Sequence, residues 1–460
     1  MRKFSLLPFL VFSLICLGGC GNSASNSGGG GGPVATQFSV TGPASSGAGF
    51  SFTFTVTARD AANKIATNYA GMVQFTSSDP AAKLPSNSAL VNGTGTFSAT
   101  LTNAGFQTIT ATDTISASLM GSLTVTAVAG EFPVASFGAK GDGHTDDTAA
   151  IQAVINAASA AGGGSVVLSV ARYFTAGTLV VPAGVVLCGS SEGPVDVSGI
   201  NPASIAVAAT LLITNTSGPF ITLQGIGAGV TDLLFHYPNQ VAISASIPNV
   251  YPYTILVTAP GTKIARSTVT NAYNFLDIES GRVLARDLFI GAFNTGVNID
   301  HAYDHVTLDN LFNQNFWEGN GQYPSPIDTW VMSHGTALVV GRVDSLEVHD
   351  FFLFSRFIGM LLTDSPDTSQ NPRCGYGTGS DIDLDTVQYG IIVTASNTPG
   401  YKFTNVDIGS GFGGVTAVQV GTGGSLPPKI EINGGSQRGI WTLGAYPPPA
   451  PDAIVVNILP

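Results

Sequence analysis

Charged side chains are scarce in this sequence of 460 residues: they make up 10%, against roughly 25% in an average soluble domain. Long amphipathic helices need charged outer faces, so this scarcity argues against a mainly helical protein and favours β-rich architecture. Basic residues are rarest, since 17 Lys and Arg face 29 Asp and Glu, for a net charge of −12. We therefore expect no nucleic acid partner, because that affinity comes from clustered basic residues. A polyanionic polysaccharide would be repelled on average and would need a local basic site.

Cysteine is also scarce, with 4 in the whole chain. No Cys/His spacing typical of a metal site occurs, and we predict no protein-bound metal. Cys188 alternates with Val186 in an apolar segment, which favours a core thiol over half of a disulfide.

The first residues have the pattern of an export signal. Arg2 and Lys3 precede an apolar run over residues 4–17, which is too short to span a bilayer comfortably. The ending Leu17-Gly18-Gly19-Cys20 resembles the lipobox of bacterial lipoproteins, which implies a signal peptide over 1–19, cleavage before Cys20 and lipidation of its thiol. We therefore expect an extracytoplasmic protein, anchored by lipid alone to the cell envelope (outer membrane or cell surface); an ordinary cleaved signal is the alternative.

Residues 20–35 are rich in Gly and Ser and predict a flexible tether. Residues 36–128 then show short alternating strands separated by turns, which is typical of a β-sandwich. The stretch 63–85 resembles bacterial Ig-like repeats, and it carries no catalytic cluster. We expect this domain to be a spacer, with carbohydrate binding as the alternative. The predicted strands cover residues 36–40, 50–57, 71–76, 95–101, 107–112 and 122–127.

The sequence changes character from Phe132 onward. Thr145 or Asp146 is placed to begin a helix, and Asp147 suits its positive end. Apolar residues 151, 154, 155 and 158 share one helical face, and glycines 162–164 end the helix before a strand over 165–168. Such a helix would cover the open end of a solenoid, whose first coil otherwise exposes its core.

This segment resembles the opening of the pectate lyase superfamily, through Phe137-Gly138-Ala139, Gly141-Asp142-Gly143, Asp146-Asp147-Thr148 and the glycine run. The resemblance implies that residues 132–460 form a right-handed parallel β-helix. The overall prediction is an all-β chain: an Ig-like β-sandwich followed by a β-helix with an N-terminal capping α-helix.

A repeated pattern supports the solenoid: apolar, any, apolar, any, polar, apolar. It occurs at residues 283–288, 306–311, 346–351, 382–387 and 401–406, with the closest copies about 20 residues apart, the length of one β-helix coil. The pattern predicts a polar ladder at a strand corner, formed by residues 287, 310, 350, 386 and 405. It also predicts two outward columns, in which acids of adjacent coils ~4.8 Å apart approach the spacing used by glycosidases. The columns contain Arg286, Asp309, His349, Asp385 and Thr404, and Leu284, Thr307, Glu347, Asp383 and Lys402. A purely solvated sheet face is the alternative.

A second type of strand begins near glycine at residues 296–300, 336–340, 359–363 and 390–394. Asp277 and Asp300 are the acids that fall in this stack. The longest insertion, over residues 312–333, carries aromatic residues whose flat faces suit sugar rings. We expect a saccharide cleft along this sheet, whereas loops that merely pack on the flank are the alternative. The aromatic candidates are Trp317, Tyr323 and Trp330.

Within that superfamily, polygalacturonase-type enzymes have motifs that can be compared position by position. Ser333-His334-Gly335 resembles their His-Gly element, and His334 is a candidate to orient a carboxylate or relay a proton. Asn294-Thr295-Gly296 lacks their aspartate, and residues 361–363 lack their basic strand end. The resemblance thus supports the scaffold more than the usual active site.

The sequence predicts a surface protein that binds and cleaves a polysaccharide, with hydrolysis favoured over elimination. No cofactor is expected; a lyase would need a basic residue and a cation such as Ca²⁺. A non-catalytic adhesin or carbohydrate-binding protein is the competing class. The catalytic candidates are Asp300, His334, Asp277, Asp309, Glu347 and His349, and the basic substrate-binding candidates are Arg282, Arg286 and Arg342.

Overall fold

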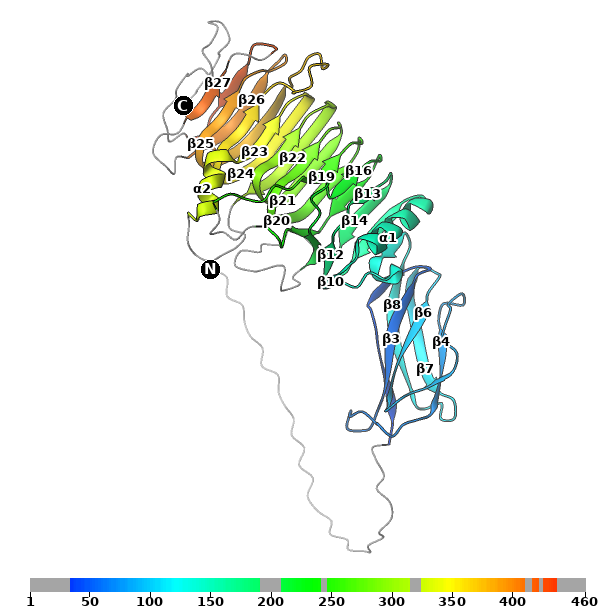
Figure 1. The fold of residues 1–460 in the computed structure, drawn as a ribbon. Helices are drawn as coiled ribbons and strands as arrows, with labels where there is room; N and C mark the ends of the chain where they lie inside the picture. Colours follow the sequence, from blue (N-terminus) through cyan, green and yellow to red (C-terminus); the bar gives the residue numbers. More distant parts are fainter. Residues whose placement is uncertain are drawn as a thin grey trace, which may run out of the picture.

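The computed structural model describes residues 34–190, 208–240, 246–314, 324–409, 416–421 and 425–436. Two β-domains follow each other along the chain (Figure 1). The first is a two-sheet sandwich, and the second is a long stack of parallel strands with the helix α1 at its N-terminal end. In the described residues, no helix is long and apolar enough to cross a membrane.

The sandwich contains one sheet of three strands and one of five. The three-stranded sheet has the order β1-β3-β6 and is antiparallel, and the five-stranded sheet has the order β2-β8-β7-β4-β5. Its core is a cluster around Phe54, Val56, Ile109 and Val125. The strands are β1 (Gln37–Thr41), β2 (Ser45–Gly47), β3 (Ser51–Arg59), β4 (Met72–Ser77), β5 (Ser88–Ala89), β6 (Thr94–Thr100), β7 (Gly105–Asp113) and β8 (Met120–Val128).

The six strands expected from alternation match β1, β3, β4, β6, β7 and β8 to within two residues at each end. Alternation succeeds here because each strand buries every second side chain, as in the buried Phe54, Val56 and Ala58 of β3. The short strands β2 and β5 carry too few residues to show that period and were missed.

The second domain starts with β9 (Glu131–Pro133), the short 3₁₀ helix η1 (Val134–Phe137) and β10 (Asp142–Asp146). Helix α1 (Thr148–Ala160) follows and buries the four apolar residues that share a face in the sequence, Ile151, Val154, Ile155 and Ala158. The predicted capping helix is therefore present. Its N-cap is Asp147, not Thr145 or Asp146, and the Asp147 carboxylate instead accepts hydrogen bonds from the amides of Lys140 and Gly141.

The rest of the domain winds through three parallel sheets, which we call sheets I, II and III in their order along each coil. Sheet I contains β9, β11, β14, β17, the first parts of β20, β21, β22, β24 and β25, and then β26 and β28. Sheet II contains β10, β12, β15, β18 and the following segments of β20, β21, β22, β24, β25 and β26. Sheet III contains β13, β16, β19, the last parts of β20, β21, β24 and β25, and β23 and β27.

The strand bounds are β11 (Gly164–Leu168), β12 (Ala171–Thr175), β13 (Leu179–Val181), β14 (Val185–Gly189), β15 (Ala209–Ile213), β16 (Ile221–Leu223), β17 (Gly229–Thr231), β18 (Leu234–His236), β19 (Tyr253–Val257), β20 (Lys263–Ile278), β21 (Val283–Ile299), β22 (Ala302–Asn313), β23 (Thr336–Val340), β24 (Val343–Leu362), β25 (Gly377–Val393), β26 (Tyr401–Ile408), β27 (Thr416–Val420) and β28 (Ile430–Asn433). A second helix, α2 (Pro326–His334), lies between β22 and β23. The parallel β-helix is thus present, and its interior is one continuous apolar cluster from Phe132 to Ile432.

The corner between sheets I and II forms the predicted polar ladder, with one change. Asp287, Asn310, Asp350 and Asn405 all have φ near +50°, a conformation in which Asn and Asp are favoured. The amide of Asn310 donates to Asp287 (2.9 Å) and that of Asn405 donates to Asp381 (2.7 Å). The fourth coil therefore contributes Asp381, and the expectation of Thr386 was wrong.

Thr386 lies at the next corner, between sheets II and III, where its φ is also positive. The same sequence pattern occurs at both corners, which explains the error in register. On sheet I, Ser380 and Thr378 consequently occupy the column positions expected for Asp385 and Asp383. Cys188 is a free thiol, as expected, but it is not a core residue: Val185 and Leu187 fill the core, and the Cys188 side chain is half-buried.

The two domains pack directly on each other. The ring of Phe50, at the edge of the sandwich, lies 4.9 Å from that of Phe132 and 5.8 Å from that of Phe137. The Ser136 hydroxyl donates to the Ser51 carbonyl at 2.9 Å. The sandwich therefore covers part of the first coil, beside α1 (Figure 1).

Candidate functional site

The six catalytic candidates do not lie on one face. Asp277 and Asp300 lie at the outer side of sheet III, whereas Asp309, Glu347 and His349 lie on the outer side of sheet I. His334 is the last residue of α2. A single active site can therefore contain the candidates of one of these places, but it cannot contain all six residues.

Asp277 is the most unusual carboxyl group of sheet III. It lies in the last part of β20, between the inward-pointing Leu276 and Ile278, and is half-buried. Burial is the main cause that raises its pKa to about 6, and the nearby acids Glu279 and Asp300 add to this effect. The Asn298 amide in the adjacent coil donates a hydrogen bond to the Asp277 carboxylate at 2.8 Å, which only partly offsets it. A carboxyl group with such a pKa can exchange a proton near neutral pH.

Glu279 is the second acid of this face. It is exposed and lies two residues after Asp277, on the same side of the chain, so their Cα atoms are ~6.6 Å apart by the rise of a strand. The sequence comparison missed Glu279 because it lies one residue beyond the strand. Its position two residues after Asp277 brings it close enough to raise the pKa of that acid.

Asp300 is buried and fully engaged. Its carboxylate accepts hydrogen bonds from the Arg342 amide (2.9 Å) and from the Ser365 hydroxyl (2.7 Å). His301 lies 3.3 Å from Asp300 and 3.0 Å from Asp367, and the hydrogen bond to Asp367 is the main cause of the raised pKa of His301. These contacts hold the loop after β24 against the end of sheet III. Asp300 is thus a positioning residue rather than a free acid.

Neutral polar side chains complete this part of the face. Tyr253 shares a hydrogen bond with Thr295, and its pKa is raised by burial and further by Asp277. The Asn294 amide donates to Asn274 at 2.9 Å. Tyr253, Asn274 and Thr295 pair in adjacent coils, so they line one outward row next to the Asp277–Asn298 row. Hydroxyl and amide groups of this kind bind the hydroxyls of a sugar.

Aromatic rings lie at the other edge of sheet III. The Trp330 ring on α2 stacks on His334, with centroids 4.5 Å apart and planes at 5°, and lies 6.0 Å from Tyr273. Tyr273 directly precedes Asn274 of the outward row. We call Tyr273, Trp330 and His334 the aromatic shelf. The His334 Nδ1 atom lies near the Trp330 carbonyl (3.0 Å) and the Ser333 hydroxyl (2.8 Å), contacts that hold its ring on the helix. Trp317 and Tyr323 lie outside the described residues.

The candidates on sheet I have ordinary surroundings. Glu347 lies 3.4 Å from His305, which contacts Thr307, and His349 contacts the Ser380 hydroxyl at 3.0 Å. Asp309 pairs in register with Arg286 and His349. The contacts of Glu347 and His349 run between coils and stabilise the sheet face.

The three basic candidates are each paired with an acid. Arg286 lies 3.3 Å from Asp287, Arg282 donates to Asp304 at 2.7 Å, and Arg342 forms an ion pair with Asp344. Arg342 is also 6% exposed and lies over the Tyr303 ring. In the described residues, none of these three arginines forms a hydrogen bond or ion pair with a residue of the Asp277–Asn298 row. Among the described residues, no three His, Cys, Asp or Glu side chains form a group that could hold a metal ion.

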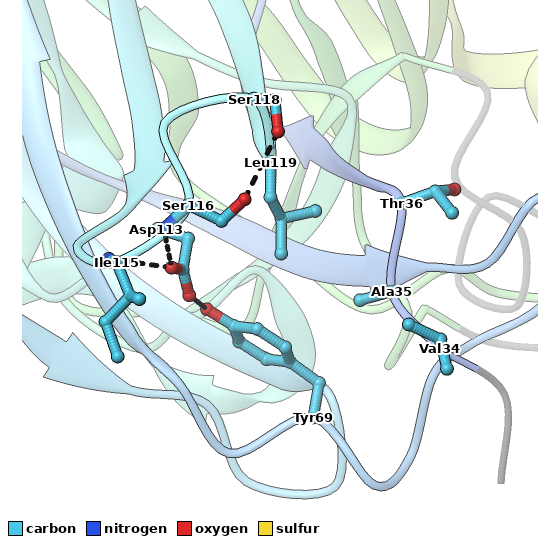
Figure 2. Close-up of a pocket in the computed structure, with 9 residues that line it drawn as sticks. All are labelled: Val34, Ala35, Thr36, Tyr69, Asp113, Ile115, Ser116, Ser118 and Leu119. Atoms are coloured by element: carbon cyan, nitrogen blue, oxygen red, sulfur yellow. Dashed lines mark hydrogen bonds between the residues drawn. The ribbon is translucent and has the colours of Figure 1, made fainter. Parts of the chain in front are cut away.

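The sandwich contains a cavity of about 550 Å³ (Figure 2). Its polar wall is Asp113, whose carboxylate accepts bonds from the amides of Ile115 and Ser116 and from the Tyr69 hydroxyl. Burial opposes ionisation of Asp113, but these bonds outweigh it and leave its pKa below the usual value. The Asp113 carboxylate is thus engaged in hydrogen bonds that stabilise a turn, and it is not a free catalytic group in this cavity.

Asp277→Asn is expected to stabilise the fold above pH 6. The folded-state pKa of this carboxyl group is about 6, above the ordinary value for an aspartate, so folding favours the protonated form. Stability is therefore unaffected below about pH 4, falls as the pH rises to about 6, and stays lowered above it. The variant should raise the free energy of unfolding by about 1–3 kcal/mol at pH 8 and change it little at pH 4, as measured by urea denaturation. Equal destabilisation at both values would contradict this.

The start of the β-helix is similar in sequence to a known protein family. Residues 132–219 match the family model described as rhamnogalacturonase A/epimerase, pectate lyase-like. The resemblance inferred from that segment is thereby confirmed for a pectate lyase-like β-helix.

Curated relatives match over short segments only. Alginate lyase 7 of Azotobacter vinelandii is 46% identical over 70 residues, which are 14% of this chain and 8% of that protein. Mannuronan C5-epimerase AlgE3 of the same organism is 60% identical over 47 residues, or 10% of this chain and 3% of that protein. The matches thus span less than a tenth of the length of either relative.

Solved structures are similar over more of the chain. The exopolygalacturonase of Thermotoga maritima is 13% identical, with a TM-score of 0.38, covering 67% of this chain and 87% of that chain. The A-module of mannuronan C-5 epimerase AlgE6 of Azotobacter vinelandii is 16% identical, with a TM-score of 0.34, covering 67% and 90%.

Proposed function

We propose that this protein binds a polysaccharide across the outer face of sheet III and hydrolyses it, with Asp277 as the general acid. One observation carries the proposal: a half-buried carboxyl group with a pKa of about 6 lies beside a row of polar side chains and close to a second, exposed acid. The family matched by residues 132–219 includes rhamnogalacturonase in its description, which supports action on glycans.

The proposed reaction uses the two acids in different protonation states. Asp277 donates its proton to the glycosidic oxygen as the bond from that oxygen to the anomeric carbon breaks. A water molecule bonds to the same carbon, and the Glu279 carboxylate accepts its proton. The proposed reaction is an inverting one, in which the two carboxyl groups leave room for that water. Asn298 orients the Asp277 carboxyl group, and Asp300 and His301 fix the loop beside it.

A reducing-end assay on the full chain over a panel of polysaccharides tests this proposal, with ultraviolet absorbance read in parallel for unsaturated products. Hydrolysis predicts new reducing ends without unsaturation. Unsaturated products would instead indicate elimination. Binding of glycans without any product would show a carbohydrate-binding protein and end the enzymatic proposal.

We infer further that the first domain is an Ig-like spacer between the envelope and the β-helix. Two observations support this role. The domain has two sheets, with the orders β1-β3-β6 and β2-β8-β7-β4-β5, as a sandwich does. The Phe50 ring also packs on Phe132 of the first coil, which fixes the domain against the β-helix.

Lipidation at Cys20 is proposed from the Leu17-Gly18-Gly19-Cys20 sequence. Cells that express the full chain should incorporate labelled palmitate into the protein, and Cys20→Ala should abolish the label and release the protein from the membrane fraction. Cys188→Ala is the matched control, because that thiol belongs to the folded β-helix and should not affect labelling. Label that persists in Cys20→Ala would contradict the anchor.

A further inference from the structure

The sheet III face is acidic where the reaction is proposed. Asp277, Glu279 and Asp300 lie at the ends of β20 and β21, and Asp367 is held next to them by His301. The basic groups near these acids are each paired with an acid. His301 lies between Asp300 and Asp367, buried Arg342 is paired with Asp344, and Arg282, three residues after Glu279, is paired with Asp304. Arg373, which donates to the Ser365 carbonyl, lies 3.9 Å from Asp364.

In the described residues, the two outward rows of this face carry no cation for a sugar carboxylate. Its two outward rows, traced through the registered pairs, contain no Lys or Arg among the described residues. One row is Tyr253, Asn274, Thr295, Thr336, Ile358, Tyr389 and Thr416, and the other is Leu256, Asp277, Asn298, Val339, Leu361, Ile392 and Gln419. A uronate polymer carries one negative charge per sugar and would place several of them along these rows. Repulsion by the acids would oppose its binding, and the net charge of −12 adds to this.

The aromatic shelf supplies a different kind of attraction. Tyr273 and Trp330 are partly exposed aromatic side chains at the start of sheet III, packed on the apolar clusters beneath them. Asp277 lies four residues after Tyr273, ~13 Å away along the strand. Between them lie the hydroxyl and amide groups of Tyr253, Asn274 and Asn298. A ring without charge can stack on the shelf and use these groups for its hydroxyls.

We propose that sheet III selects a neutral glycan and rejects polyuronates. This inference rests on the proposed function and departs from the relatives, whose names refer to alginate and mannuronan. The substrate is thus a polymer of uncharged sugars, bound by stacking and hydrogen bonds, with its cleaved bond over Asp277 and Glu279.

Affinity electrophoresis of the full chain tests the inference. Neutral polymers (mannan, galactan, xylan, glucan and fructan) are compared with alginate and polygalacturonate, in EDTA and with Ca²⁺. The tightest neutral polymer should bind at least ~tenfold more tightly than either polyuronate, and higher salt should strengthen the weak polyuronate binding by screening. Trp330→Ala should weaken neutral binding at least ~fivefold, as loss of an aromatic anchor does. Thr329→Ala on the exposed side of α2 is its matched control.

The outcomes separate the two claims. Tightest binding to a polyuronate, with or without Ca²⁺, would overturn the neutral preference and leave the glycan site standing. Failure of every polymer to bind would overturn both. Neutral binding that Trp330→Ala leaves unchanged would remove the aromatic shelf from the argument and so contradict the inference.

Discussion

Asp277→Asn is expected to lower kcat for glycan hydrolysis by about 10²- to 10⁴-fold, the usual contribution of a general acid. KM should change little, because the asparagine keeps the shape of the side chain and can still accept the hydrogen bond from Asn298. Initial rates of reducing-end release measure both constants. The loss should occur in a protein that is more stable above pH 6, which distinguishes a catalytic role from a structural one.

The pH profile gives the same test in the unmodified protein. The acid must be protonated to act, so kcat should fall as the pH rises through about 6, the pKa of Asp277. Asp309→Asn is the matched control: this acid lies on sheet I, and its replacement should leave both kcat and the profile unchanged. Activity retained in Asp277→Asn, or lost in Asp309→Asn, would move the active site away from sheet III.

Phe235→Ala is expected to lower the free energy of unfolding of the β-helix by about 3–5 kcal/mol. Phe235 is completely buried in sheet II, and its ring lies 6.4 Å from that of Phe220 and 6.5 Å from that of Phe275. The substitution leaves a cavity that the closely stacked coils cannot fill. Urea denaturation followed by circular dichroism measures the loss. Phe106→Ala is the control, since Phe106 is 83% exposed and should change stability by less than about 0.5 kcal/mol.

A decrease in the free energy of unfolding below about 1 kcal/mol in Phe235→Ala would contradict the stacked core, because removal of a fully buried aromatic ring costs more than that. The same variant also bears on the site. Phe275 contacts Phe235 and lies two residues before Asp277, so the activity of the variant should fall together with its stability.

The architecture was predictable because it depends on local periodicity. Alternation in β3 and the helical spacing of Ile151, Val154 and Ile155 follow from one buried face, which the sequence records directly. The corner residues Asp287 and Asn310 were also found, since a left-handed backbone favours Asn and Asp.

The site was predictable only in part, because it depends on register between coils. The predicted alignment of β25 was shifted by one corner and gave Thr386 in place of Asp381, because both corners have the same sequence pattern. Asp277 was identified as an acid of the right stack, but its partners were not. Asn298 and His301, on the next coil, become its neighbours only when β20 and β21 are aligned. The alignment also places Glu347 and His349 on sheet I, away from Asp277, although all three were candidates for the same catalytic site.

The central claim is that sheet III, and not sheet I, holds the glycan. A crystal structure of the Asp277→Asn protein soaked with a bound oligosaccharide tests it most directly. The account predicts sugar density that begins on the aromatic shelf at Trp330 and crosses Asn274 to reach Asn298 and Glu279. Density that lies instead over Asp309, Glu347 and His349 on sheet I would contradict it.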